Sequence, residues 1–313
     1  MKKALIVGIN SYPSAPLYGC INDASAFGSI METHGDGSPN FGIKLLTDVP
    51  TKSELKTAIV ELFNGISDTA LFYFSGHGVL NELGGYIVTP DYGKNDEGVS
   101  MDEILTLANK SKAKDKIIIL DCCHSGSFGT PQASGGIASQ IIEGVVILTA
   151  SRDSESALEV NGHGVFTNLL LDALQGGAAD LRGHITPGSV YAYIDQALGP
   201  WDQRPVFKTN VTRFTSLRTI TPLISPDIMR MMTVYFPTPE HQFQLNPTFE
   251  DTNTEVARSA NVAVFKHLQR FQSVGLVVPV DADFMYFAAQ NSTSCRLTAL
   301  GYHYWRLVKD KRI

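Results

Sequence analysis

Short apolar runs alternate with amphipathic segments up to about residue 210. Four runs are rich in β-branched residues and almost continuously apolar, namely KKALIVGI, TALFYFSG, KIIILDCC and GVVILTAS. Continuous apolar runs of this length are typical of parallel strands that are covered on both faces. Segments with helical spacing lie between them, such as INDASAFGSIMETHG, TKSELKTAIVELFNGI, SMDEILTLANKSK and GVFTNLLLDALQGG. This alternation predicts an α/β layered domain with a mostly parallel sheet.

The pattern loosens after residue 213 and resumes near residue 257. Residues 214–256 contain several prolines and predict a connector with at most one or two short helices. In residues 257–313, a helix-like segment (ANVAVFKHLQRFQSVG) precedes FMYFAAQNSTSCRL, in which we expect two strands around an Asn/Ser/Thr turn, and LTALG opens a final helix. This order resembles the wing of winged helix-turn-helix domains. The pattern therefore predicts an α/β domain over 1–213, a connector over 214–256 and a winged-helix-like domain over 257–313.

The composition is that of an ordinary globular protein, with 43% hydrophobic and 18% charged residues. No apolar run approaches the roughly 20 residues that cross a bilayer, so no membrane partner is expected. The opening MKKALIVGIN resembles the start of a signal peptide, but its apolar run stops at Asn10 without a small-residue cleavage site, which favours a buried first strand. The four cysteines form no disulfide framework, since only Cys122 and Cys123 are close in sequence. This usage indicates a reducing, cytoplasmic location.

Charge is distributed unevenly along the chain. Residues 256–313 carry eight Lys or Arg and three Asp, a net charge of +5, although the whole chain has a net charge of −6. A basic segment permits nucleic-acid binding, yet the expected helix offers only a thin set of groups for reading a groove. These groups are Arg258, Lys266, His267 and Arg270. We therefore favour a protein partner or an autoinhibitory contact for the C-terminal domain, with DNA binding and a purely structural role as the alternatives.

Two motifs with reactive side chains follow directly after apolar runs. FYFSGHG places His77 after one expected strand, and DCCHSG places Cys122 and Cys123 after another. Reactive residues gather at the carboxyl ends of parallel strands, so both motifs are expected at one edge of the sheet. Cysteine catalysis needs a thiolate, a nearby histidine and donors for an oxyanion. The 46 residues from His77 to Cys123 agree with a caspase-type spacing of about 50 and predict a Cys/His dyad.

Each motif also has a simpler interpretation. SGHG alone fits a turn with an incidental histidine, and buried cysteines often act as small apolar side chains. A zinc site at Cys122, Cys123 and His124 is disfavoured, because adjacent residues at the end of a strand point in opposite directions. A disulfide between the two cysteines would form only under oxidation and would disable the site. The joint occurrence of both motifs at this spacing favours catalysis.

Several further motifs occur in the order of one known family. ALIVGIN, YGCINDA, YFSGHG, DCCHSG and VVILTAS followed by GVFTNLLLDAL span about residues 1–210. The combination resembles the caspase-like cysteine peptidases, and specifically the metacaspase/orthocaspase branch. The resemblance implies a caspase-like three-layer sandwich, with Cys123 as the nucleophile and His77 as its base. It also implies that the backbone amides of Gly78 and Cys123 stabilise the oxyanion, whereas Cys122 fills a variable position.

The same resemblance implies an acidic pocket for the residue that precedes the scissile bond. Its carboxylates correspond to Asp23 and Asp121, with Cys20 and Ser75 lining the pocket nearby. Such a pocket accepts Arg or Lys, and a fork of carboxylates suits a guanidinium better than an ammonium. We therefore expect a protein or peptide substrate with a basic residue at this position. A role for Asp23 as a helix N-terminal acid and for Asp121 as a strand-end cap is compatible with the pocket.

Two features depart from the common pattern of the branch. Many relatives have a calcium site built from several acids, whereas Thr130 here occupies a position that is usually acidic, and the acids of the corresponding region are scattered. These acids are Glu82, Asp91, Asp102 and Glu103. We therefore expect no cofactor or metal, with calcium dependence as the less favoured alternative. The second feature is that residues 117–151 contain no Lys or Arg, so an enzyme specific for basic residues should not cut itself there and should work as an intact chain.

Together these inferences predict a cysteine endopeptidase that cleaves after Arg or Lys in a partner protein. Prokaryotic relatives in this branch are often tied to stress, programmed cell death or antiphage defence, and the resemblance implies such a context. The alternative is a regulator, a winged-helix binding protein whose protease-like domain senses or scaffolds. The presence of both His77 and Cys123 favours the enzyme.

Overall fold

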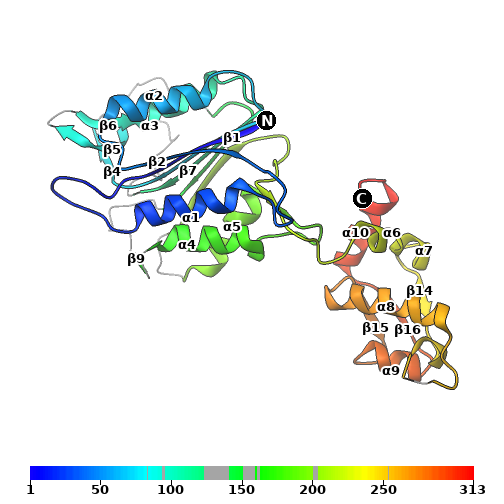
Figure 1. The fold of residues 1–313 in the computed structure, drawn as a ribbon. Coiled ribbons are helices and arrows are strands. Elements are labelled where there is room, and N and C mark those ends of the chain that lie inside the picture. Colours follow the sequence, from blue (N-terminus) through cyan, green and yellow to red (C-terminus); the bar gives the residue numbers. More distant parts are fainter. Residues whose placement is uncertain are drawn as a thin grey trace. The chain divides into compact units, whose positions relative to one another are not determined.

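The computed structural model describes most of the chain. The described residues are 1–82, 84–93, 96–122, 141–150, 159–160, 163–199, 204–252 and 254–313. They divide into two compact units, residues 1–221 and residues 222–313 (Figure 1). Each unit buries apolar residues of its own.

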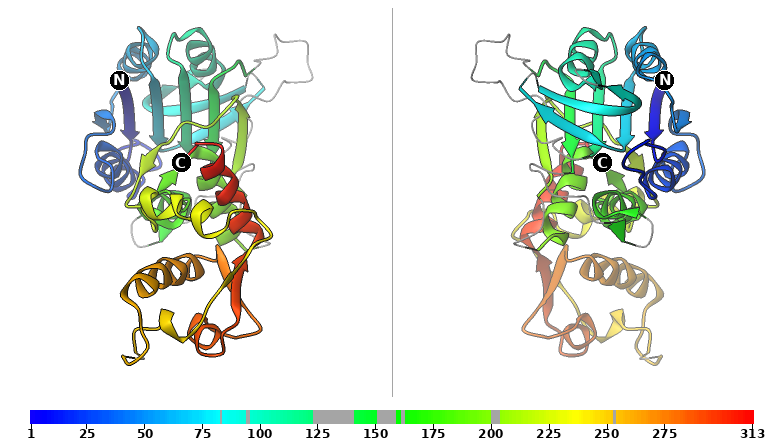
Figure 2. Two further views of the ribbon diagram at one scale, coloured as in Figure 1. Left: turned by 90° about the vertical axis from the view of Figure 1, so that its right-hand side faces the viewer. Right: turned by 90° about the vertical axis from the view of Figure 1, so that its left-hand side faces the viewer.

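A six-stranded sheet forms the centre of the first unit. The apolar runs of the sequence supply its inner strands, because side chains on both faces of these strands are buried. The strands are, in spatial order, β12 (Val206–Asn210), β8 (Val145–Thr149), β7 (Asp115–Asp121), β3 (Thr69–Ser75), β1 (Lys2–Gly8) and β2 (Gly42–Thr47). Neighbouring strands pair in parallel except for β12, which runs antiparallel to β8. The expected mostly parallel sheet is confirmed, and its strands lie side by side in Figure 2.

Helices cover both faces of this sheet (Figure 1). On one face lie α1 (Cys20–Glu32), α4 (Val165–Asp172) and α5 (Pro187–Ala197), and on the other lie α2 (Lys52–Phe63) and α3 (Met101–Lys110). Alternating side chains of β7 enter the two cores, with Ile119 on the α1 face and Leu120 on the α2 face. The same alternation turns Asp121 toward the α1 face and Cys122 toward the α2 face. The two residues at the end of β7 therefore lie in different environments.

Short elements surround the sheet. β4 (Gly78–Asn81), β5 (Gly84–Gly93) and β6 (Asp96–Ser100) form a small antiparallel sheet, β9 (Glu159–Val160) pairs with β10 (His163–Gly164), and β11 (His184–Ile185) pairs with β13 (Arg218–Thr219). A π-helical turn, η2 (Ala173–Gly177), extends α4. α5 begins at a capping box, in which the Thr186 side chain accepts from the Ser189 backbone amide, with Pro187 at the first helical position. None of the helices that the structure describes has the length and hydropathy of a membrane span.

The second unit combines a three-stranded antiparallel sheet with helices. Its elements are α6 (Pro226–Arg230), α7 (Met232–Tyr235), β14 (Gln242–Gln244), η3 (Pro247–Phe249), α8 (Ser259–Ser273), β15 (Val277–Val280), α9 (Met285–Gln290), β16 (Ser294–Leu297) and α10 (Ala299–Lys309), with the sheet order β14–β16–β15. The indole N–H of Trp305 donates to the backbone oxygen of Phe236 at 2.6 Å, and the hydroxyl of Tyr235 lies 2.7 Å from Nδ1 of His267. Residues 222–256, which belong to the expected connector, therefore supply helices and a strand to this unit.

The expected strand at FMYFAA is wrong, because most of these residues form α9. Met285, Ala288 and Ala289 are buried and share one helical face at i, i+3 and i+4 spacing. The neighbouring Tyr286 and Phe287 are exposed, so the segment is amphipathic with a helical rather than a strand period. β16 forms as expected, but its hairpin partner is β15.

Candidate active site

Strands β3 and β7 end side by side. Ser75, the last residue of β3, is the register partner of Asp121, the last residue of β7. The two reactive motifs therefore leave the sheet at one edge, with His77 two residues beyond Ser75 and Cys123 two residues beyond Asp121. Cys123, the expected nucleophile and one expected oxyanion donor, lies outside the described residues.

His77 is oriented by the loop that follows β1. Its Nε2 lies 2.7 Å from the backbone oxygen of Ala15. A carbonyl oxygen can only accept, so Nε2 is the donor, and in the neutral imidazole Nδ1 then carries the lone pair. An imidazole in this tautomer can take up a proton at Nδ1, which is what the base of a cysteine nucleophile must do.

Tyr12 holds the backbone at His77. Its hydroxyl accepts from the backbone amide of His77 at 3.1 Å and donates to the backbone oxygen of Val88 at 3.3 Å. Burial raises the pKa of Tyr12 above its ordinary value, so the hydroxyl stays protonated and keeps both bonds. Gly76 leaves room for this contact, because a Cβ there would lie 2.6 Å from the Tyr12 hydroxyl oxygen. The two rings of Tyr12 and His77 also touch, with centroids 4.5 Å apart.

Gly78 and Cys122 flank the two reactive positions. Gly78, the other expected oxyanion donor, is half-buried and begins β4 directly after His77. Cys122 is 3% exposed and packs into the core that lies between the sheet and α2 and α3. The Cys122 thiol is thus part of the apolar interior, on the face opposite the Asp121 carboxylate.

Two buried carboxylates converge at the same edge of the sheet. Asp23, in the first turn of α1, is 2% exposed, and Asp121 is 6% exposed. Both side chains border Gly164, where a Cβ would lie 2.8 Å from Oδ2 of Asp121 and 3.4 Å from Oδ2 of Asp23. A side chain at this position would collide with the Asp121 carboxylate. The structure thus brings together the two acids that the sequence predicted for one pocket.

Asp23 accepts hydrogen bonds from three described residues. Its Oδ1 lies 2.6 Å from Nδ1 of His163. Its Oδ2 accepts from the backbone amide of Gly164 at 3.2 Å and from the hydroxyl of Ser75 at 3.4 Å. Burial raises the pKa of Asp23, and these bonds, that of His163 first, oppose the rise.

Asp121 ends a short chain of hydrogen bonds. The hydroxyl of Thr167 donates to Oδ2 of Asp121 at 2.6 Å, and the hydroxyl of Tyr73 lies 2.6 Å from Oγ1 of Thr167. Since Thr167 uses its proton on Asp121, Tyr73 is the donor in the second bond. Burial raises the pKa of Asp121 to about 7, the bond from Thr167 opposes the rise, and the charge of Asp23 adds to it. A cation placed between the two carboxylates would lower both pKa values, so this pair has the chemistry of a cation-binding site.

Residues 1–216 match the family model described as the caspase domain. The chain belongs to the caspase domain family. This family comprises cysteine peptidases, and the expectation of a caspase-like cysteine peptidase is confirmed. Among solved structures, the chain is similar to the crystal structure of caspase-1 from Spodoptera frugiperda, with 13% sequence identity and a TM-score of 0.51, covering 70% of this chain and 90% of that chain. That likeness shows a shared fold, and no curated protein matches the chain.

Two further residues were expected to line the acidic pocket of the caspase domain. Ser75 contacts Asp23 directly. Cys20 is 7% exposed and lies one helical turn before Asp23, so both residues lie on the same side of α1. The side chain of Asn10 accepts from the Cys20 backbone amide at 3.0 Å, which fixes this end of the helix. The structure therefore places Ser75 at the carboxylates and Cys20 beside them on α1.

Sequence reasoning missed the residues that hold the predicted ones. A sequence cannot show which backbone carbonyl, such as that of Ala15, will accept a hydrogen bond. It gives little indication that the hydroxyl of Tyr12 has a role at the site. It does indicate Thr167, because this is a polar residue on the buried face of an apolar helix, at 0% exposure. Gly164 begins GVFTNLLLDAL, one of the motifs that carry the family resemblance, and His163 directly precedes this motif.

Among the described residues, no group of three His, Cys, Asp or Glu side chains is arranged to hold a metal ion. Two of the acids considered for calcium have other partners. A carboxylate oxygen of Asp91 accepts from the Lys52 backbone amide at 3.0 Å, and Glu103 pairs with Lys56 at 2.7 Å. These acids contribute to the contacts of α2 with its neighbours.

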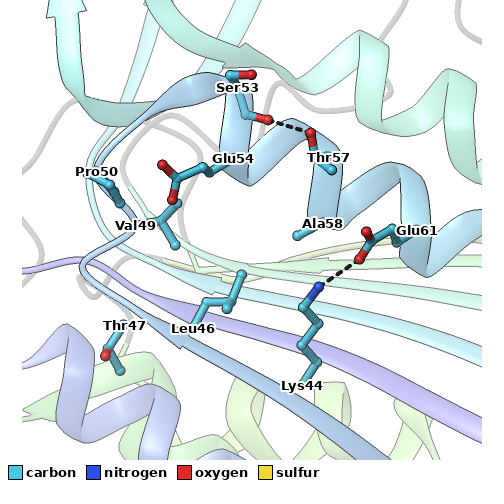
Figure 3. A pocket seen from close by; sticks show the side chains of 10 residues that line it. All are labelled: Lys44, Leu46, Thr47, Val49, Pro50, Ser53, Glu54, Thr57, Ala58 and Glu61. Carbon is cyan, nitrogen blue, oxygen red and sulfur yellow. Dashed lines mark hydrogen bonds and ion pairs between the residues drawn. The ribbon is translucent and has the colours of Figure 1, made fainter.

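A cavity of about 370 Å³ lies beside β2 and α2, away from the motifs (Figure 3). Lys44 and Glu61 form an ion pair of 2.7 Å at its wall. None of the predicted site residues lines this cavity. The chemistry of the caspase domain is therefore not located there.

Proposed function

We propose that the chain is a cysteine endopeptidase of the metacaspase/orthocaspase branch that cleaves after Arg or Lys. The convergence of the buried carboxylates of Asp23 and Asp121 on Gly164 carries this proposal. An ionised carboxylate is costly to bury unless it is paired. A guanidinium or ammonium from the residue before the scissile bond would pair with both carboxylates, whereas an Asp there would add a third negative charge. Basic specificity follows from this difference.

In the proposed reaction, Nδ1 of His77 takes the proton of the Cys123 thiol, and the thiolate attacks the scissile carbonyl carbon. The backbone amides of Gly78 and Cys123 donate to the resulting oxyanion. The intermediate collapses as His77 gives its proton to the departing amine, which leaves a thioester on the enzyme. A water molecule, deprotonated by His77, then attacks the thioester carbon. The C–S bond breaks, the new carboxyl terminus leaves, and His77 returns the proton to the sulfur of Cys123. Throughout, the bond from Nε2 to Ala15 keeps the imidazole in one orientation.

Hydrolysis of fluorogenic peptides tests this proposal. The peptides differ only in the residue before the scissile bond, which is Arg, Lys or Asp, and the enzymes are the wild type, Cys123→Ala and Asp23→Asn. We expect the wild type to prefer Arg over Lys and to ignore Asp, and Cys123→Ala to be inactive. Asp23→Asn should lower kcat/KM for Arg by about 100-fold, the effect of losing a charged hydrogen-bond partner. Calcium and a chelator should leave these rates alike.

A preference of the wild type for Asp, or turnover by Cys123→Ala, would contradict the proposal. The alternative function, a regulator with a protease-like scaffold, predicts no turnover on any of the three peptides. We place the enzyme in the cytoplasm, acting on a partner protein in a stress, cell-death or defence pathway. This context rests on the resemblance to prokaryotic members of the branch.

We also propose that the second unit is a winged-helix-like domain that binds a protein. The sheet order β14–β16–β15, with α8 placed before the β15–β16 hairpin, supports a winged-helix-like arrangement. Of the four basic groups expected on this helix, Lys266 pairs with Asp251 at 3.4 Å and His267 contacts Tyr235, which leaves two exposed arginines. The helix that would enter a groove therefore offers few cations to neutralise phosphates. A mobility-shift assay with duplex DNA at low salt should show no complex, and a salt-dependent complex would favour DNA binding instead.

A further inference from the structure

His163 is the most exposed of the groups that hold Asp23. Its side chain is 28% exposed, whereas Asp23 is 2% exposed and the contacting Ser75 is also 2% exposed. The Gly164 donor is a backbone amide of β10 and cannot turn away without moving the strand. His163 can leave Asp23 by rotation about its side-chain bonds alone. Of these three donors, His163 is therefore the one that can be exchanged at the lowest cost.

Binding of a basic side chain to Asp23 requires such an exchange. The carboxylate is closed to solvent, and its Oδ1 is already occupied by Nδ1 of His163 at 2.6 Å. A buried oxygen cannot accept a guanidinium in the same direction that an imidazole N–H occupies. The incoming cation must displace the imidazole or approach a carboxylate that has turned away from its present partners.

The imidazole of His163 and the expected guanidinium of the substrate bind a carboxylate such as Asp23 in similar ways. Both are planar, both present N–H donors, and a protonated imidazole carries the same single positive charge as a guanidinium. We propose that His163 is a gate of the acidic pocket, which occupies Oδ1 of Asp23 in the substrate-free enzyme and is displaced by the basic side chain of the substrate. This inference rests on the proposed function, because it assigns a role in substrate binding to a residue of the same pocket.

Such a gate weakens the binding of every basic side chain by the same factor. The apparent affinity of a ligand falls by the fraction of enzyme in which the gate is open. A guanidinium can offer Asp23 and Asp121 several N–H donors in a fixed plane, whereas an ammonium acts as a point charge. The preference for Arg over Lys therefore comes from the two carboxylates, and the displacement of His163 costs both ligands the same. Removing the imidazole should tighten the binding of both cations by the same factor and leave the ratio of their affinities unchanged.

Inhibition by agmatine tests the gate, because this small guanidinium can fill the pocket without a peptide backbone. The inhibition constant and the kcat and KM of Arg and Lys peptides are measured for the full chain and for His163→Ala. The measurements are made at about pH 8, above the pKa of about 7 that burial gives Asp121. We expect the inhibition constant and the KM of His163→Ala to be about tenfold lower than those of the wild type, with a smaller change in kcat. Tenfold is the effect of removing one hydrogen bond to a carboxylate that the ligand would otherwise have to displace. The preference for Arg over Lys should not change, because both side chains displace the same imidazole.

Two further variants separate a gate from a purely structural role. His163→Gln keeps an N–H donor that can reach Asp23 and should give values between those of the wild type and His163→Ala. His184 is half-buried in the short strand β11, and His184→Ala is the control for loss of a histidine, with unchanged constants. Circular dichroism verifies that each variant is folded. If His163 had a purely structural role, His163→Ala would raise KM and lower kcat, and His163→Gln would restore both to the wild-type values. This result would overturn the gate.

The wild type distinguishes failure of the gate from failure of the proposed function. A wild type that cleaves Arg peptides and binds agmatine, together with an inhibition constant of His163→Ala that is unchanged or raised, would overturn only the gate. A wild type that does neither would overturn the basic specificity itself and the gate with it.

Discussion

Replacing Asp121 by Asn separates what the acidic pocket costs in stability from what it contributes to binding. Asn has nearly the same shape as Asp and can still accept the hydrogen bond that Thr167 donates at 2.6 Å. It carries no charge. Since Asp121 is buried and its pKa is raised from 3.8 to about 7, the substitution removes a charge that the folded protein accommodates poorly.

The size of the effect follows from the pKa of Asp121. One pKa unit corresponds to about 1.4 kcal/mol, so the rise from 3.8 to about 7 corresponds to about 4 kcal/mol. The folded state holds this proton more tightly than the unfolded state, and the wild type therefore loses stability as the pH rises from about 4 through about 7. The free energy of unfolding of Asp121→Asn should exceed that of the wild type by up to about 4 kcal/mol above about pH 7 and should match it near about pH 4.

Urea unfolding followed by circular dichroism at a series of pH values measures this difference. Both proteins carry Cys123→Ala, which prevents self-cleavage during the experiment. Asp115→Asn is the control, since Asp115 begins the same strand but is half-buried with Lys116 and Arg213 nearby, and its gain should be smaller. In the active background, Asp121→Asn should lower kcat/KM for Arg peptides by about 100-fold. An Asn variant no more stable than the wild type at about pH 8 would refute the reasoning.

Three other substitutions or incubations test separate parts of the site. Tyr12→Phe removes the hydroxyl that holds the backbone of His77, the proposed base, and steady-state kinetics should show kcat about tenfold lower with little change in KM. Cys122→Ala should cost about 1 kcal/mol of unfolding free energy and retain most activity, and inactivity of the folded variant would contradict the assignment of Cys122 to the core. Residues 117–151 and 219–229 contain no Lys or Arg, so mass spectrometry after prolonged incubation should find no cleavage within either range. Cleavage there in the wild type, but not in Cys123→Ala, would contradict basic specificity.

The sequence predicts the inner strands of the sheet well and its margins poorly. β1, β3, β7 and β8 are buried on both faces, and apolar residues fill most of their positions. β2 (GIKLLT) lies at the edge of the sheet, and several of its side chains are exposed, so it has no continuous apolar run. α9 has a run of aromatic residues that is typical of a strand, and its true period shows only in which side chains are buried. Short segments carry too little pattern to distinguish the two structures.

The residues of the candidate site also fall into those that the sequence predicts and those that it does not. His77, Asp23 and Asp121 lie in recognisable motifs, and the order of the strands brings their motifs to one edge of the sheet. The groups that tune these residues come from distant segments. His163 reaches Asp23, and Thr167 of α4 reaches Asp121, because α4 packs beside α1. That packing depends on the whole core and is not encoded in any local pattern.

Covalent trapping with peptidyl halomethyl ketones tests the proposed nucleophile and the proposed pocket together. The wild type is incubated with two reagents that differ only in carrying Arg or Asp next to the ketone, and the modified residue is located by tandem mass spectrometry. We predict rapid modification of Cys123 by the Arg reagent and little by the Asp reagent. Modification of Cys122 in place of Cys123, or faster modification by the Asp reagent, would contradict the account.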